Sequence, residues 1–258
     1  MRKPNRINVL LGFLIVAGIG CLVLVSIVAP WSGARLTASA SKKSSVQPTR
    51  PHPQDIQEFK NRFSKADFDA PEPSDPAEKE KRKYKNKHFN KMNMVSREPT
   101  RYWSILVTEW DVGLPPLPAA QSSAILIVEP LTSAAHLSDD KTGVYTEFSA
   151  KLHEAVKSDD PLLTKNSLVN VSRPGGVVRY RNGEESLSAI KGQNMLRVGK
   201  RYLLFLKPIG QTKDFEIVTG YEIDNGKVMP LDDASQFKTY KGVDEETFLK
   251  AVRAAITG

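Results

Sequence analysis

Short apolar runs separated by turn residues dominate the chain after residue 101. In Val144–Lys157 apolar and polar side chains alternate, with Glu154 as the exception on the apolar side. A period of two predicts a β-strand with one face in a core and the other toward water. Residues 124–128 form a compact apolar run suited to a buried strand. Residues 202–206 are apolar at every position, which predicts a strand covered on both faces or at the centre of a barrel.

Further strand signals fill the space between these runs. Residues 168–171 and 177–180 flank an Arg-Pro-Gly-Gly segment, and residues 215–223 follow 202–206 as a partner strand. Asn182-Gly183 and Asn225-Gly226 each predict a type I′ hairpin. Six or seven short strands at this spacing predict a mainly β domain, either a small closed barrel or a β-sandwich.

The chain is expected to finish in an α-helix. Asp244 can cap it, and Val243 and Phe248 occupy hydrophobic-staple positions. The apolar stripe of this helix consists of Phe248, Leu249, Val252 and Ile256. Such a stripe predicts that the helix packs on the barrel or closes its open end.

A long uncharged segment, residues 7–34, predicts a membrane anchor. We expect a single transmembrane helix over residues 7–31, with Trp31 at the interface and residues 1–6 as a cytoplasmic tail. The lipid bilayer is then the partner of residues 7–31. The basic residues before the run favour a cytoplasmic N-terminus, which places the C-terminal domain outside the cytoplasm. Two alternatives remain open: cleavage after Ala40, and a lipid anchor on Cys21.

The segment between the anchor and the strands is predicted to be a flexible polar stalk over residues 32–99, followed by the globular domain over 100–258. The first 100 residues carry 18 Lys and Arg against 9 Asp and Glu, whereas the rest carries 19 against 20. The basic character therefore belongs to the front of the chain. Its densest part, residues 78–91, reads either as a solvated linker or as a patch for an anionic surface.

Several blocks carry a resemblance: residues 136–148, 173–178, 199–206 and 220–222. Over residues 124–256 they resemble an uncharacterised family of bacterial exported or membrane-anchored proteins. The order of strand, long strand, Gly-Gly turn and strand is also similar to the OB-like barrels of the metalloproteinase-inhibitor and netrin type, although the cysteine framework of those inhibitors is absent. The resemblance implies a bacterial envelope setting and a small β-barrel. It implies no catalytic residues.

Candidate chemistry is sparse. The single cysteine lies in the apolar run, so the rest of the chain has neither a disulfide nor a thiolate ligand. His136 has Ser138, Asp139 and Asp140 as sequence neighbours, but no nucleophile-elbow pattern surrounds them, so we interpret them as a polar turn. His153 is expected to be exposed on the polar face of its strand. No spacing indicates a calcium loop or a phosphate loop, and we expect no catalytic residue, no metal and no cofactor.

The candidate binding surface surrounds the Gly-Gly turn. It consists of Arg173, Arg179, Tyr180 and Arg181, with Gly175 and Gly176 as structural turn residues. The near-neutral charge of the domain argues against a nucleic-acid partner. The sequence favours a membrane-tethered, extracytoplasmic binding or assembly module of the cell envelope, whose partner is an envelope protein or polymer. An enzyme of unrecognised type, and attachment to an anionic surface through the basic stalk, are the alternatives.

Overall fold

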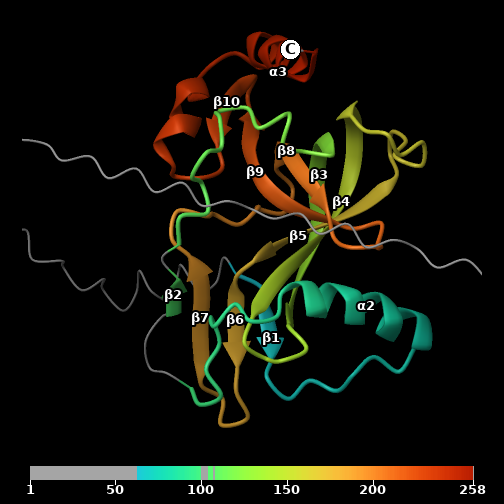
Figure 1. The fold of residues 1–258 in the computed structure, drawn as a ribbon, viewed down its shortest axis with the longest axis vertical. Helices are drawn as coiled ribbons and strands as arrows, with labels where there is room; N and C mark the ends of the chain where they lie inside the picture. The colour runs from blue at the N-terminus through green and yellow to red at the C-terminus, as the bar shows by residue number, and fades with distance from the viewer. Residues whose placement is uncertain (1–62, 100–103, 107, 258) are drawn as a thin grey trace, which may run out of the picture. The chain divides into compact units, whose positions relative to one another are not determined.

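Figure 1 shows the computed structural model of the protein, which describes residues 63–99, 104–106 and 108–257. The chain divides into two units, Met1–Thr49 and Arg50–Gly258, and every described residue belongs to the second. The elements of this unit are, in chain order, β1 (Lys65–Asp67), α2 (Pro76–His88), β2 (Ser104–Leu106), β3 (Ala124–Leu137), β4 (Val144–Lys157), β5 (Leu168–Pro174), β6 (Gly176–Arg179), β7 (Glu185–Ile190), β8 (Arg201–Pro208), β9 (Phe215–Asp224), β10 (Lys227–Pro230), the 3₁₀ helix η1 (Ser235–Tyr240) and α3 (Glu245–Thr257).

A small five-stranded barrel forms the centre of the fold. Strands β3, β4 and β5 form an antiparallel meander, β5 pairs in parallel with β9, and β9 forms a hairpin with β8. Antiparallel pairing of β8 with β3 closes the sheet on itself. The mainly β prediction is therefore confirmed, and the barrel rather than the sandwich is the architecture.

The barrel interior is filled by alternate side chains of its strands. Members of this core include Leu126, Val128, Phe148, Ala150, Tyr202, Leu204 and Ile217. Strand β4 has the predicted bounds and mostly follows the predicted alternation of burial. In β8 all of residues 202–206 are buried because Leu203 and Phe205 point away from the interior into a second cluster. The prediction of a strand covered on both faces is confirmed.

The second cluster lies between the outside of the barrel and the C-terminal elements. Phe248 and Val252 of α3 and Phe237 of η1 are buried against Leu203 and Phe205 of β8. Figure 1 shows α3 and η1 at the same end of the barrel as β10. Of the two predicted roles for this helix, it packs on the barrel wall.

A four-stranded sheet adjoins the barrel, in the order β1, β6, β7 and β2. Strands β6 and β7 form an antiparallel hairpin within the connection from β5 to β8. At the two edges of the sheet, β1 pairs in parallel with β6, and β2 pairs in parallel with β7. Figure 1 shows this sheet below the barrel, with β6 and β7 at its centre. The segment before the barrel thus supplies β1 and β2 to a sheet whose central strands, β6 and β7, are inserted in sequence between the barrel strands β5 and β8.

The two Asn-Gly turns differ. Asn225 and Gly226 both have positive φ, 51° and 72°, between β9 and β10, as a type I′ hairpin requires. At the β6–β7 turn Gly183 has a φ of 81°, but the φ of Asn182 is not positive. The hairpin there is confirmed, but its predicted type I′ turn is wrong.

The stalk prediction requires a correction for residues 63–99. This stretch contains β1 and α2, and Phe63, Ala66, Phe89 and Met94 are buried in it. The apolar residues of this stretch are few and irregularly spaced, so hydrophobic periodicity does not predict its burial. These residues are buried by contacts with distant parts of the chain. The folded unit therefore begins well before residue 100.

The predicted membrane helix over residues 7–31 lies outside the described residues, as do the tail over residues 1–6 and the possible cleavage and lipid sites at Ala40 and Cys21. Within the part of the chain that the structure describes, no helix has the length and apolar character needed to cross a bilayer.

Candidate ligand pocket between helix α2 and strand β3

The predicted binding surface separates into buried and exposed residues. Arg173 is fully buried, and its two terminal nitrogens donate to the two carboxylate oxygens of Asp232 at 2.8 and 2.6 Å. Thr219 also donates to Asp232, at 2.9 Å. A buried bidentate pair of this kind holds the β5 end and the β10–η1 connection together. The prediction that Arg173 belongs to a binding surface is therefore wrong.

Tyr180 is also buried and has a structural role, because its ring stacks on Phe68 and its hydroxyl donates to the carbonyl of Ser96 at 2.8 Å. Arg179 and Arg181 remain at the surface near the β6–β7 turn. Arg179 approaches Asp67 at 3.8 Å, and Arg181 approaches Asp69 at 3.5 Å. Only these two of the four candidates are available to a ligand.

The Gly-Gly segment is a close-packed link between the barrel and the second sheet. Gly175 has φ 119°, and a Cβ there would lie 2.5 Å from the methyl carbon of Met195 and 3.2 Å from the carbonyl oxygen of Ser188. A Cβ on Gly176 would lie 3.0 Å from a methyl group of Val144. Positive φ and close packing explain why glycine occupies position 175, and close packing alone explains the glycine at position 176.

Helix α2 is attached to the barrel through a buried ammonium group. The side chain of Lys85 is 2% exposed and contacts the carboxylates of Glu147 on β4 and Asp214 before β9, the latter at 3.0 Å. Asn170 donates to the other oxygen of Asp214 at 3.1 Å. A charge buried this deeply needs paired, hydrogen-bonded partners. The pairing therefore specifies where α2 sits on the barrel.

One turn further along, the chain continues across the same barrel face. The ring of Phe89 stacks on that of Tyr145 with centroids 4.3 Å apart, and the Tyr145 hydroxyl donates to Asn86 at 2.7 Å. The amide of Met94 donates to the carbonyl of Thr142 at 2.8 Å. The segment from α2 to residue 95 thus covers the barrel from β4 to the β3–β4 turn.

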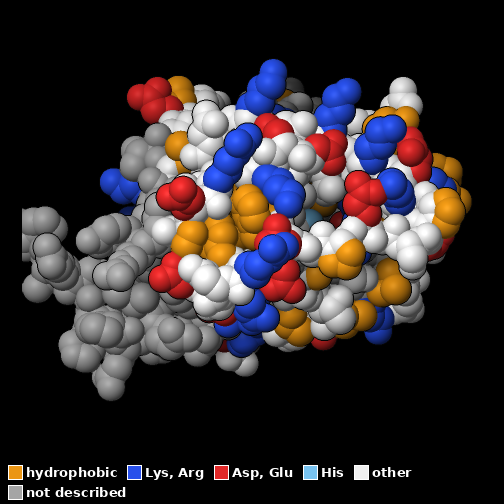
Figure 2. All heavy atoms as spheres, turned by 90° about the horizontal axis from the view of Figure 1, so that it is seen from below, with side chains coloured by type: hydrophobic (Ala, Val, Ile, Leu, Met, Phe, Trp, Pro, Cys, Tyr) orange, Lys and Arg blue, Asp and Glu red, His pale blue; other side chains and the backbone are white. Residues whose placement is uncertain are grey.

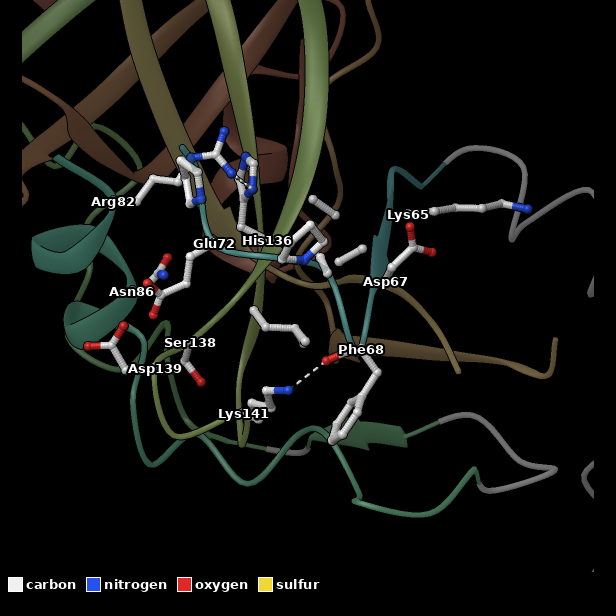
Figure 3. A pocket seen from close by; sticks show the side chains of 16 residues that line it. Lys65, Asp67, Phe68, Glu72, Arg82, Asn86, His136, Ser138, Asp139 and Lys141 are labelled. Carbon is white, nitrogen blue, oxygen red and sulfur yellow. Dashed lines mark hydrogen bonds between the residues drawn. The ribbon is translucent and has the colours of Figure 1, made fainter. Parts of the chain in front are cut away.

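A hollow of about 390 Å³ opens beside this segment. It is bounded by α2, strand β1, the loop over residues 68–73, and the end of β3. Figure 3 shows Arg82 of α2 and His136 of β3 pointing toward each other on one side, with Lys141 on the other side donating to the carbonyl of Phe68 at 2.8 Å. We call this hollow the α2–β3 pocket.

His136 has a defined tautomer in the α2–β3 pocket. Its Nδ1 lies 3.2 Å from a guanidinium nitrogen of Arg82. A guanidinium group can only donate, so Nδ1 accepts and the proton of the neutral ring resides on Nε2. Burial, together with the charge of Arg82, lowers the pKa of His136 from 6.5 to about 4. At neutral pH the residue is therefore an uncharged N–H donor.

The prediction that His136 lies in a polar turn is wrong, because the residue belongs to β3. The turn itself begins at Ser138, whose hydroxyl donates to Asp140 at 2.7 Å and accepts from the amide of Gly143 at 2.8 Å. Ser138 is thus held as a turn residue rather than as a nucleophile. His153 pairs with Glu129 at 3.1 Å on the outside of the barrel.

The side chains around the α2–β3 pocket can be tested for the arrangements that a metal site or a catalytic base requires. Among the described residues, no group of three or more His, Cys, Asp or Glu side chains could hold a metal ion. The side-chain hydrogen-bond partner of His136 is the guanidinium of Arg82 rather than a carboxylate, so its neutral ring presents an N–H donor. The α2–β3 pocket is suited to binding.

The sequence analysis missed Arg82 and Asn86, both of which line the pocket. One local signal could have revealed their helix: Asp75 accepts from the amide of Ala77, and Pro76 begins α2. Asp followed by Pro is a typical helix start. Residues 82 and 86 then lie one turn apart on one face.

Comparison with known protein families finds no matching family model, and comparison with curated proteins finds no significant match. The resemblance to an exported bacterial family stays a prediction.

Proposed function

We propose that this protein is a membrane-tethered binding or assembly module of the cell envelope, with its barrel domain outside the cytoplasm. The uncharged run over residues 7–34 supports the tether, and the basic residues before it support the orientation. The observation that carries the binding function is the α2–β3 pocket, where the neutral ring of His136 and the neighbouring guanidinium of Arg82 present hydrogen-bond donors.

We further propose that the barrel is OB-like. A three-stranded meander, a parallel pairing of its third strand, and a final hairpin that closes on the first strand support this assignment. OB-folds bind ligands on their second and third strands and on the loops after the first and fourth strands. The corresponding loops here are residues 138–143 and 209–214.

In this protein α2 and the residues after it lie across that face. Lys85 contacts Asp214 in one of the two loops, and Met94 is hydrogen-bonded to Thr142 in the other. Lys85 and Met94 are buried there and cover part of the face that OB-folds use for ligands. The hollow that remains next to α2 is the α2–β3 pocket, which supports placing the ligand there.

Two measurements on the full chain test this proposal. Protease added outside spheroplasts should digest the barrel domain, and protection of the domain would overturn the orientation. The binding part is tested by capture from solubilised membranes with the wild type, with Ala70→Phe at the pocket, and with Ala120→Phe as a matched control away from it. We expect one envelope component to be captured by the wild type and the control and lost with Ala70→Phe. Equal capture by all three would exclude the pocket.

Attachment to an anionic surface is a second candidate. Lys79, Lys83 and Lys87 recur every four residues of α2 and all are exposed, as is Tyr84 between them. Each lysine near an anionic membrane contributes about 1 kcal/mol to attachment, and salt weakens the attraction. Replacement of the three lysines by glutamine should then abolish salt-sensitive binding to anionic vesicles. Unchanged binding would remove this candidate.

A further inference from the structure

We propose that the α2–β3 pocket binds an uncharged, hydroxyl-rich ligand, namely a saccharide unit. The inference rests on the proposed binding function and adds the chemical class of the ligand. Three properties of the pocket support it: its balance of charge, its mixture of unused donors and acceptors, and its apolar wall.

The charges around the pocket are balanced. Its lining contains three basic side chains, Lys65, Arg82 and Lys141, and three acidic ones, Asp67, Glu72 and Asp139. Figure 2 shows basic and acidic side chains interspersed on the face of the molecule seen from below, without a broad area of one sign. A single-sign field would be needed to attract a strongly charged ligand.

Most of these charges also have partners already. Lys65 contacts Glu185 at 2.8 Å, and Arg82 donates to Glu78 at 2.8 Å. Glu72 pairs with Lys79. A charged ligand would have to compete with these pairs and lose the strong hydration of an ion, whereas an uncharged ligand leaves the pairs in place and loses only the weaker hydration of its hydroxyl groups.

The groups left over can donate and accept. Among the described residues, the Nε2–H of His136 and the amide nitrogen of Asn86 have no hydrogen-bond acceptor, and the carboxylate of Asp139 has no donor. A carboxylate ligand could only accept from this set, and an ammonium ligand could only donate to it. A hydroxyl group does both. Several hydroxyls on one ring match the mixture better than either kind of ion.

Apolar side chains complete the wall. They include Ala66, Ala70, Pro71, Pro73 and Leu137. The C–H faces of a sugar ring can lie against such a surface while its hydroxyls reach the polar groups. The volume of about 390 Å³ is near the lower end of the range, about 300 to 1,000 Å³, of small-molecule sites, which suits a ligand of sugar size.

Saturation-transfer NMR on the full chain tests the proposal. The protein is kept in a detergent without sugar head groups, because residues 7–34 are apolar and a glycoside detergent would compete. The probes are glucose and N-acetylglucosamine as neutral sugars, acetate as an anion, and glycine as a zwitterion. Each is measured with the wild type, Ala70→Phe, His136→Leu and the control Ala120→Phe.

We expect signals from a neutral sugar with the wild type and with Ala120→Phe. The signals should vanish with Ala70→Phe, and the affinity should fall about tenfold with His136→Leu, as loss of one good hydrogen bond predicts, because leucine has no donor. Signals from acetate or glycine alone that Ala70→Phe removes would overturn the saccharide assignment and keep the pocket as the binding site. Signals from no probe, or signals that persist with Ala70→Phe, would overturn both the saccharide assignment and the pocket.

Discussion

Helices α2 and α3 have the same length, 13 residues, and both pack on the barrel, but they do so by different means. The α3 helix buries an apolar stripe that includes Phe248 and Val252. The only residue of α2 buried on the barrel is Lys85, which is held by Glu147 and Asp214. Hydrophobic periodicity therefore reveals α3 from sequence and conceals α2, since a single buried charge has no period.

The two modes of attachment also differ in what their loss should cost. An apolar helix gains stability from burial that is roughly proportional to area. A buried ion pair contributes little net stability, yet removing one partner is costly because the other charge stays buried and unpaired. The following predictions test this contrast, from the largest expected effect to the smallest.

Lys85→Ala should lower the free energy of unfolding by about 3 to 5 kcal/mol, because it leaves the buried carboxylate of Asp214 and the half-buried carboxylate of Glu147 without their cation. Urea unfolding of the full chain measures the loss, and amide hydrogen exchange should show faster exchange over Pro76–His88. The matched control on the same helix is Lys83→Ala, whose side chain is 66% exposed. Equal, small effects of the two changes would mean that the buried pairing does not hold α2.

Acid should weaken the same part of the fold through His136. Because the pKa of His136 is lowered from 6.5 to about 4, the unfolded chain binds more protons than the folded one between these values. This contribution to stability is complete above pH 6.5 and falls by up to about 3 kcal/mol as the pH drops toward 4. His136→Gln should remove that part of the slope in urea titrations between pH 7 and 4.5.

His88 provides the control for the pH prediction. Its hydrogen bond to Glu216 raises the pKa of His88 above 6.5, so its contribution is present at low pH and is lost as the pH rises through the raised value. His88→Gln should therefore change the slope in the opposite direction. If both changes altered it in the same direction, the lowered pKa of His136 would be wrong.

Gly175→Val tests the link between the barrel and the second sheet. Its φ of 119° and the close Met195 and Ser188 atoms predict a loss of about 1 to 3 kcal/mol in thermal or urea unfolding. The control Gly183→Ala has positive φ as well, but nothing lies within 4 Å of a Cβ there. A larger loss for Gly183→Ala than for Gly175→Val would show that packing at the link is unimportant.

Joint replacement of Arg179 and Arg181 by serine should have the smallest effect, less than about 1 kcal/mol, because their ion pairs are at the surface. The same variant separates two binding sites. Weaker capture of an envelope component would favour the originally predicted surface at these arginines. Unchanged capture, together with loss in Ala70→Phe, would favour the α2–β3 pocket.

Local patterns predicted most of the barrel but almost none of the candidate site. Strand β4, the fully buried residues 202–206 and α3 follow from periodicity, because each period reflects burial of one continuous face. The pocket joins Arg82, assigned to the stalk, to His136, assigned to a turn. Arg173 is predicted to be at the surface because it clusters with Arg179 and Arg181 around the Gly-Gly turn, and its buried partner Asp232 is 59 positions away.

The sequence by itself determined the mainly β character, the positions of several strands, the glycine-dependent turns and the C-terminal helix, since these depend on side-chain spacing within one segment. Only the tertiary structure decided between barrel and sandwich, incorporated residues 63–99 into the fold, and buried Arg173 and Lys85. Arg173 meets Asp232 from 59 positions away, and Lys85 meets Glu147 from 62 positions away. A charged side chain can be buried only where its partner is, and that place is known only once distant segments have come together.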